Sequence, residues 1–204
     1  MYTVIGQLRS RAFRVLWTLE ELGQDYAHVD AAPRSEAART HHPPGKIPIM
    51  LVDGEVLTDS VAIMSYLADV HGQLGSPAGT IPRARLDAML HNLNEELDAT
   101  LWLMARHSFI LPQERRVPAA IETAKWEAAQ ALDRLADRIT ASWLMGETFT
   151  IADILAVHCA SWAQSLDIRS DNDGLRAYIK RARARPAFRK TAALAHDDGA
   201  TPRG

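Results

Sequence analysis

The sequence predicts a small α/β domain with the element order βαβαββα, followed by an all-α domain. Three observations indicate this division. Short β-branched and apolar runs that suit strands occur only in the first 60 residues. Apolar residues at helical spacing dominate from residue 82 onward. Between these parts, the stretch 72–81 is rich in glycine and small residues and has no periodicity, as is typical of a linker. We therefore predict domains at 1–72 and 82–196, a linker at 73–81 and a flexible tail at 197–204.

The elements of the first domain follow from local signals. Apolar residues recur at helical spacing up to Leu22, and Gly23 then suits the position just after a helix end. Asp53-Gly54 lies between two apolar runs and predicts a two-residue hairpin turn. Pro43 ends a short alanine-rich helix. The predicted strands are 2–5, 26–29, 47–51 and 56–58, and the predicted helices are 10–22, 35–41 and 60–71.

The second domain shows helical signals only. Pro82 suits a first helical turn, and one apolar stripe then continues for about six turns. Pro112 and Pro118 bracket the loop before a second long helix, which ends near residue 140. Shorter helices are expected at 151–162, 175–182 and 186–195. The stripe consists of Leu86, Met89 or Leu90, Leu93, Leu97, Leu101 and Met104.

A capping pattern predicts where the 151–162 helix begins. Thr150 is a favoured N-cap, and Asp153 stands three residues later, where a capping box usually has Glu or Gln. Phe149 precedes the cap and can pack on Ile154 as a hydrophobic staple. The helix is largely apolar, so we expect it to be buried. We expect Cys159 on this helix to be a small core residue.

Composition excludes several classes of protein. The 204 residues are 47% hydrophobic and 24% charged, with a net charge of −2, which argues against a general nucleic-acid binder. One cysteine excludes an internal disulfide, and no CxxC pair is present for dithiol chemistry. The sequence has no apolar run long enough to span a membrane and no signal-peptide pattern, so we expect a cytoplasmic location.

The stretch 42–60, HPPGKIPIMLVDGEVLTDS, combines features that suit an anionic peptide ligand. The backbone of Ile47, just before Pro48, can pair with an extended ligand as one more strand. Pro48 cannot donate to a ladder, so it suits a sheet edge or a cis turn. Asp59 and Ser60 stand at a helix start, where unpaired N–H groups attract a carboxylate. Each feature alone is usually structural, and their order is what makes the stretch informative.

Four segments together resemble the cytosolic glutathione transferase superfamily. They are SRAFRVLWTLEELG at 10–23, HPPGKIPIM at 42–50, LTDSVAIMSYL at 57–67 and FTIADI at 149–154. The resemblance covers the first domain almost end to end and implies that this domain has a thioredoxin-like fold. It also implies glutathione as co-substrate and an enzyme that adds the glutathione thiol to a small electrophile. For Thr150 and Asp153, it implies a role in folding only.

Ser10 is the residue that the resemblance makes catalytic, as in the serine-dependent classes of the family. It follows the first strand and stands where the first helix begins. Serine is also a favoured N-cap in any protein, and Gln7, Arg9 and Arg11 are further donors near the same position. Tyr2 stands too early to match the tyrosine-dependent classes. No cysteine occurs near position 10, which argues against the cysteine-dependent classes.

The resemblance also assigns the glutathione contacts. Ile47, beside a cis Pro48, pairs with the cysteinyl backbone. Ser60 binds the γ-glutamyl carboxylate, and Asp59 faces the γ-glutamyl amine. Lys46 reaches the glycine carboxylate. His42 departs from the pattern, because the family commonly has asparagine there, and its role stays open.

The electrophile site is expected between the domains, and members of this family usually form twofold dimers. Asn94 or Asp98 would then reach the partner's glutathione. The sequence has eight histidines, but no His, Cys or carboxylate set has ligand spacing, so we expect no metal. The candidate residues for the electrophile site are Leu8, Trp102, Met104, His107 and Phe109.

Two other functions fit the same residues. One is a catalytically silent glutathione-transferase-like module that binds ligands or a protein partner. The other is a glutathione-dependent isomerase or peroxidase that uses the same thiolate. The identity of the electrophile cannot be predicted, because a pocket of apolar side chains carries no readable code.

Overall fold

The computed structural model describes residues 1–197 of the 204-residue chain. By its internal contacts the chain divides into two units. Unit 1 comprises Met1–Pro77 together with the chain from Arg183 onward, and unit 2 comprises Ala78–Ala182. The tail predicted for 197–204 lies outside the described residues, except for Asp197 at the end of the last helix.

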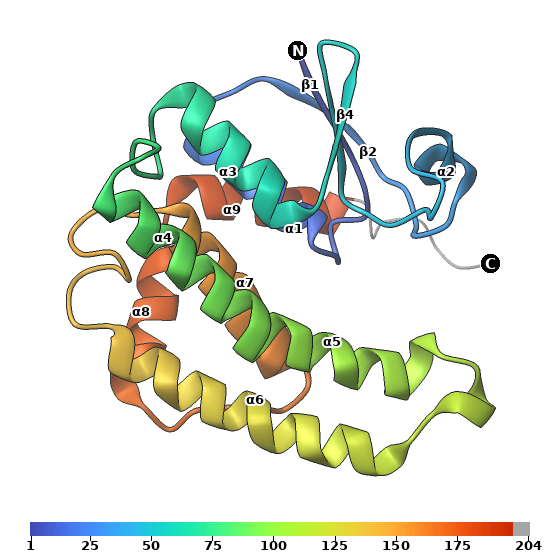
Figure 1. The fold of residues 1–204 in the computed structure, drawn as a ribbon, viewed down its shortest axis with the longest axis vertical. Coiled ribbons are helices and arrows are strands. Elements are labelled where there is room, and N and C mark those ends of the chain that lie inside the picture. The colour runs from blue at the N-terminus through green and yellow to red at the C-terminus, as the bar shows by residue number, and fades with distance from the viewer. Residues whose placement is uncertain (198–204) are drawn as a thin grey trace. The chain divides into compact units, whose positions relative to one another are not determined.

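Unit 1 is built on a four-stranded mixed sheet of strand order β2-β1-β3-β4 (Figure 1). Strand β1 pairs in parallel with β2 and antiparallel with β3, and β3 pairs antiparallel with β4. Asp53 and Gly54 join β3 to β4 with φ angles of 50° and 86°. Positive φ at both positions is the signature of a type I′ hairpin, so the predicted turn is confirmed. The strands are β1 (Tyr2–Ile5), β2 (Tyr26–Val29), β3 (Ile49–Val52) and β4 (Glu55–Thr58).

The two faces of the sheet carry separate apolar clusters, because successive side chains of a strand point to opposite faces. Val4 and Met50 join the larger cluster with helices α1 (Ala12–Glu21) and α3 (Ser60–His71), which pack on each other. Ile5 points the other way and clusters with Ala38 of helix α2 (Glu36–His41). The observed order βαβαββα confirms the predicted fold of this part.

The last helix, α9 (Pro186–Asp197), belongs to unit 1, although the sequence grouped residues 186–196 with the helical domain. It lies against α1, where Phe188 packs edge-on against Trp17 with ring centroids 4.9 Å apart (Figure 1). Arg185, just before α9, binds Glu21 of α1 through two contacts of 2.7 Å. An amphipathic pattern shows that a helix packs somewhere but not against which partner, so the sequence could not reveal this.

Unit 2 is all helical within the described residues, which confirms the predicted class of this part. Its first helical run extends from residue 81 to residue 110 and is not purely α-helical. Two π-helical segments interrupt it, where the sequence predicted one regular helix. The elements are α4 (Ile81–Asn92), η1 (Leu93–Asp98), α5 (Ala99–Ala105), η2 (Arg106–Ile110), the 3-10 turn η3 (Gln113–Arg115), α6 (Pro118–Arg138), α7 (Ile151–Ser165) and α8 (Asp173–Arg183).

Candidate functional site

Three loops of unit 1 meet at one end of the sheet. The register pairs Ile5, the last residue of β1, with Ile49, the first residue of β3. Ile49 in turn pairs with Thr58, the last residue of β4. The segments 6–10, 46–48 and 59–60 therefore leave or enter the sheet at the same end. This topology brings together the residues predicted to bind glutathione and the residue predicted to activate it.

Gly6 allows two of these loops to approach closely. Its φ is +148°, and a Cβ atom on it would lie 3.0 Å from the Cβ of Ala12 and 3.1 Å from the Cβ of Ile47. Any larger residue would push the start of α1 away from the loop before Pro48. The start of α1 and the loop before Pro48 can therefore lie this close only because residue 6 is glycine. The sequence patterns did not reveal this requirement.

Ser10 lies in the turn before α1, two residues ahead of the first helical residue. Its half-buried hydroxyl donates to the carbonyl of Gln7 at 2.6 Å and accepts from the N–H of Ala12 at 3.1 Å. In this arrangement Ser10 supports the first turn of the helix. Donation to a bound sulfur requires the hydroxyl to rotate away from Gln7, since it has only one hydrogen to donate.

The loop before β3 presents backbone groups at the sheet edge. The Ile47-Pro48 peptide bond is cis, as expected. Within residues 1–197, no backbone hydrogen bond uses the N–H or the C=O of Ile47. Pro48 is buried, whereas the side chain of Lys46 is exposed. These are the properties of a segment that can accept an extended peptide as an additional strand.

The preceding turn is fixed by its backbone. Gly45 has a φ of +65°, and a Cβ there would lie 2.7 Å from the Cα of Arg34. The carbonyl of Gly45 accepts from the N–H of Arg34, and its N–H donates to the carbonyl of His42, both at 2.7 Å. His42 therefore holds the loop through its carbonyl oxygen, which asparagine would supply equally well.

Asp59 and Ser60 form the start of α3. Asp59 has a φ of 69°, which is unusual for a residue other than glycine. Its Oδ1 accepts from the N–H groups of Val61 and Ala62 at 2.9 and 3.0 Å. The buried hydroxyl of Ser60 accepts from Nη1 of Arg14 at 3.3 Å. Within the described residues, no backbone hydrogen bond uses the N–H of Ser60.

Arg14 is a residue that the sequence reading overlooked. Its side chain is completely buried on α1, among residues that are mostly apolar. An arginine at an inward position of an amphipathic helix is a signal that could have been noticed, because buried charges require partners.

The predicted electrophile residues are divided between the units. Leu8 belongs to unit 1 and is 6% exposed, whereas the other four belong to unit 2. Met104 is buried in the apolar stripe, while Phe109 is 63% exposed. Nδ1 of His107 accepts from the N–H of Val117 at 3.1 Å, which ties η2 to the loop before α6. Trp102 is 38% exposed, and a substrate-binding role for these residues stays a prediction.

Asp98 lies inside unit 2. It is 4% exposed, and its Oδ2 accepts from the thiol of Cys159 at 3.6 Å. Cys159 is fully buried, as expected. The half-buried Asn94 is thus more accessible than Asp98 for a contact with a partner subunit.

The predicted capping box at the start of α7 is present. Asp153 is completely buried and accepts four hydrogen bonds. One oxygen binds the N–H of Leu144 at 2.9 Å and the hydroxyl of Tyr178 at 2.7 Å, and the other binds the N–H and hydroxyl of Thr150 at 2.8 and 3.1 Å. Burial raises the pKa of Asp153, against the lowering effect of these bonds. The residue therefore joins three segments of unit 2.

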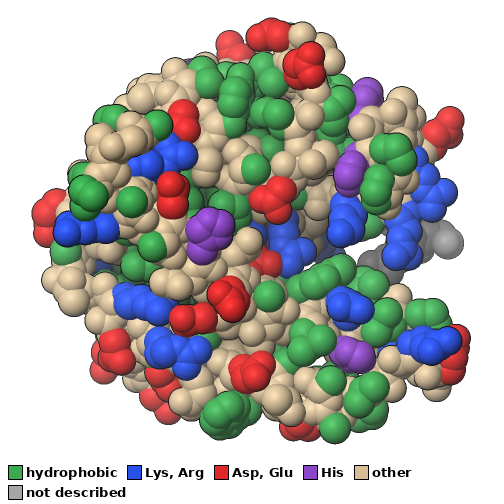
Figure 2. All heavy atoms as spheres, in the orientation of Figure 1, with side chains coloured by type: hydrophobic (Ala, Val, Ile, Leu, Met, Phe, Trp, Pro, Cys, Tyr) green, Lys and Arg blue, Asp and Glu red, His purple; other side chains and the backbone are tan. Residues whose placement is uncertain are grey.

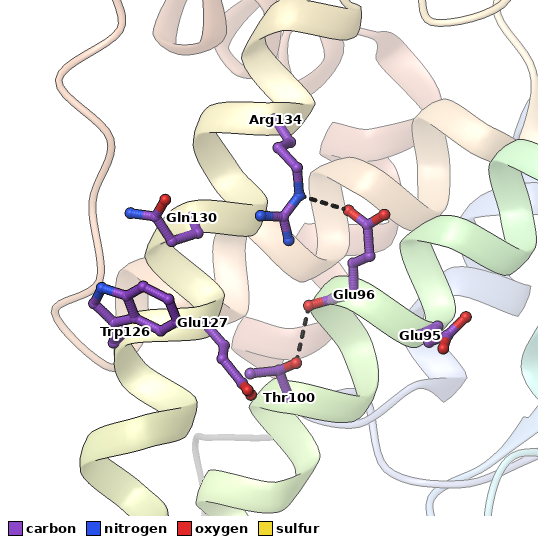
Figure 3. A pocket seen from close by; sticks show the side chains of 7 residues that line it. All are labelled: Glu95, Glu96, Thr100, Trp126, Glu127, Gln130 and Arg134. Carbon is purple, nitrogen blue, oxygen red and sulfur yellow. Dashed lines mark hydrogen bonds and ion pairs between the residues drawn. The ribbon is translucent and has the colours of Figure 1, made fainter.

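A separate surface hollow of ≈ 340 Å³ lies in unit 2 (Figure 3). Arg134 and Arg138 bind the two oxygens of Glu96 at 3.0 and 3.1 Å, which links α6 to η1. Burial works against the charge on Glu96, but these hydrogen bonds outweigh it and lower its pKa. The hollow contains no predicted site residue. Its lining consists of Glu95, Glu96, Thr100, Trp126, Glu127, Gln130 and Arg134.

Acidic and basic side chains are interspersed over the face shown in Figure 2. Among the described residues, no three His, Cys, Asp or Glu side chains come together as a group able to hold a metal ion. None of the helices in residues 1–197 combines the length and apolar content needed to cross a membrane.

Two family models match most of the chain. The N-terminal domain of glutathione S-transferase matches residues 10–70, and the C-terminal domain matches residues 99–186. The chain is 28% identical over 179 residues to glutathione S-transferase GstA of Escherichia coli O157:H7, covering 83% of this chain and 86% of that protein.

Solved structures show the same fold. A glutathione transferase from Methylococcus capsulatus superposes with a TM-score of 0.84 at 25% identity, covering 96% of this chain and 99% of the other. A theta class glutathione S-transferase from Xanthomonas axonopodis pv. citri, with glutathione bound, has a TM-score of 0.77 at 23% identity, covering 93% and 96%. The chain belongs to the cytosolic glutathione transferase superfamily and is a transferase enzyme of that family.

Proposed function

We propose that the protein binds glutathione at the sheet end of unit 1 and stabilises its thiolate with the hydroxyl of Ser10, for conjugation to a small hydrophobic electrophile. The observation that carries this proposal is the meeting of three loops at that end, set by the pairing of Ile5, Ile49 and Thr58. One loop carries a hydroxyl, one an unpaired strand edge and one a helix start. These are the groups that a thiol, a peptide backbone and a carboxylate require.

The energetics of thiol activation support a single donor. A free thiol has a pKa of about 8.5, and lowering it by about two units corresponds to roughly 2.7 kcal/mol. A hydrogen bond to a charged acceptor contributes about 1.5–3 kcal/mol, and release of Ser10 from Gln7 costs about 0.5–1.5 kcal/mol. The start of α1 adds about 0.3–1 kcal/mol for a nearby anion. The balance is a pKa lowered by about one to two units, without a general base.

The glutathione contacts follow the three loops. The N–H and C=O of Ile47 pair with the cysteinyl backbone, and Lys46 reaches the glycine carboxylate. Ser60 offers both its N–H and its hydroxyl to the γ-glutamyl carboxylate. Asp59 faces the γ-glutamyl amine. The glutathione-bound relative from Xanthomonas axonopodis supports glutathione as the co-substrate.

The electrophile site, the dimer and the location belong to the same proposal. We propose Leu8, Trp102, Met104, His107 and Phe109 as the residues that bind the electrophile. The protein forms a twofold homodimer in which Asn94 approaches the partner's glutathione. We also propose that it acts in the cytoplasm.

Calorimetric titration with glutathione, followed by an assay with a generic aryl halide, tests the proposal. Binding with turnover is the expected result, and S-methylglutathione, whose sulfur is blocked, should bind without turnover. Binding of glutathione without turnover of any electrophile would instead indicate a silent binding module. Absence of heat on titration with glutathione would overturn the proposal.

A further inference from the structure

Arg14 is held inside unit 1 at the point where α1 faces the start of α3. Its side chain has no exposed surface, and its Nη1 donates to the hydroxyl oxygen of Ser60 at 3.3 Å. Residues 14 and 60 are 46 positions apart, so this contact exists only in the folded unit. A guanidinium is rarely buried completely, because the loss of its hydration is costly. The contact with Ser60 places this buried guanidinium beside a residue of the predicted ligand site.

The chemistry of the contact fixes the direction of the Ser60 hydroxyl. A guanidinium has donors only, so the Ser60 oxygen must accept from Arg14. The single hydrogen of the hydroxyl then points to another acceptor. Within residues 1–197, no hydrogen bond has the Ser60 hydroxyl as its donor. Arg14 thus leaves Ser60 with a hydrogen to give and with one oxygen lone pair already occupied.

The electrostatics of the same place favour an anion. The start of a helix carries a partial positive charge, which attracts an anion. The Asp59 carboxylate lies at this helix start, but its Oδ1 is bound to the N–H groups of Val61 and Ala62. The N–H of Ser60 and its hydroxyl hydrogen both suit an incoming carboxylate.

We propose that Arg14 is a positioning residue for substrate recognition: it orients the Ser60 hydroxyl so that the site selects the γ-glutamyl carboxylate of the tripeptide. This inference rests on the proposed function. Arg14 does not touch the ligand but acts through Ser60. Its loss should therefore weaken recognition of the carboxylate specifically and leave the rest of the tripeptide interaction intact.

Two blocked tripeptides test this role by calorimetry. One is S-methylglutathione, and the other is its analogue with a 4-aminobutyryl group, which lacks only the γ-glutamyl α-carboxylate. The wild-type protein should bind the first about tenfold or more tightly than the second, as expected for a hydrogen bond to a charged group. In Arg14→Lys and Arg14→Gln this ratio should fall several-fold, while affinity for the 4-aminobutyryl peptide changes little.

A double-mutant cycle separates positioning from packing. In the Ser60→Ala background, Arg14→Lys should change the affinity for S-methylglutathione by less than about twofold. Thr18→Val is the matched control, because Thr18 is equally buried on α1 and its hydroxyl binds the carbonyl of Arg14 at 2.8 Å. This control should alter stability but not the ratio between the two peptides.

Removal of a buried arginine can prevent folding, so a measurement on the wild-type protein is also needed. In ¹⁵N-labelled protein, the guanidinium resonances of Arg14 should shift when S-methylglutathione binds and stay in place when the 4-aminobutyryl peptide binds. Equal responses to both peptides, or an unchanged affinity ratio in a folded Arg14 variant, would overturn this inference alone. Failure of both peptides and glutathione to bind the wild-type protein would overturn the proposed function as well.

Discussion

The helices α3 and α7 begin with similar residues but in opposite environments. At the start of α7, Asp153 is fully buried and accepts four hydrogen bonds from three residues of unit 2. At the start of α3, Asp59 is exposed, binds two N–H groups of its own helix and has a positive φ. Ser60 beside it keeps a hydroxyl hydrogen and an N–H that no residue in 1–197 accepts.

The difference distinguishes a helix start used for folding from one available to a ligand. At the start of α7, both carboxylate oxygens of Asp153 are used inside the protein, so this carboxylate can offer nothing to a substrate. A helix start that leaves one N–H and one hydroxyl unused can bind a carboxylate. The unusual φ of Asp59 agrees with this, because backbone conformations of this kind gather at functional sites.

Replacement of the buried carboxylate should have the largest effect. Asp153→Asn turns one acceptor oxygen into a donor that faces other donors, so the free energy of unfolding should fall by about 2–3 kcal/mol. Denaturant unfolding measures this change. Asp59→Asn is the matched control and should cost only a few tenths of a kcal/mol, because asparagine caps helices as well as aspartate. Equal losses for the two variants would contradict the comparison.

The start of α1 is a third case, because the Ser10 hydroxyl supports the helix turn and, in our proposal, also binds the ligand sulfur. Ser10→Ala should raise the thiol pKa of bound glutathione by about one to two units. When the pKa returns to about 8.5, the thiolate fraction at pH 7 falls by roughly eight- to twenty-five-fold. Ultraviolet absorbance of the thiolate across a pH titration reports this shift. Ser10→Thr keeps the hydroxyl and should retain most of the effect. An unchanged titration in Ser10→Ala would assign the role to Gln7, Arg9 or Arg11.

The ligand-facing start of α3 should respond in affinity more than in stability. Ser60→Ala removes the hydroxyl, and the dissociation constant for glutathione should rise about tenfold. The thiol pKa of the glutathione that still binds should stay unchanged, since Ser60 does not contact the sulfur in our proposal. Calorimetry measures the first quantity and absorbance the second. An unaltered dissociation constant would remove the proposed carboxylate contact.

The smallest expected effect is on stability and concerns Glu96, a carboxylate that is partly buried and lies outside the predicted ligand site. Arg134 and Arg138 lower the pKa of Glu96 in the folded protein. The stabilisation is therefore present above the unfolded pKa and is lost as the pH falls through the lower folded pKa. Glu96→Gln should cost about 0.5–1 kcal/mol at pH 7, because the pair is partly solvated. Wild type and variant should become equally stable in acid, well below about pH 4, as seen by thermal unfolding.

The sequence predicted the local elements of the site well. The cis bond before Pro48, the hairpin at Asp53-Gly54 and the capping box at Thr150 follow from residue types that tolerate few other conformations. The predicted start of α1 was two residues too early, because Ser10 suits the turn before a helix as well as the helix itself.

Contacts between distant residues could not be predicted. The pairing of Arg14 with Ser60 depends on how α1 packs on α3, which no local pattern encodes. The π-helical segments η1 and η2 were missed because apolar residues every three or four positions fit an α-helix equally well. Asp153 was recognised as a cap, but its bonds to Leu144 and Tyr178 come from other segments.

The return of α9 to unit 1 makes the helical unit an insertion within the chain of the other unit. The backbone crosses between the units twice, at 77–78 and at 182–183. A protease that cut only one crossing would nick the protein without releasing either half. To exchange the helical unit with that of a relative, both the 77–78 and the 182–183 junctions must be replaced. A fragment of residues 1–77 alone would lack α9 and would expose the surface of α1 around Trp17.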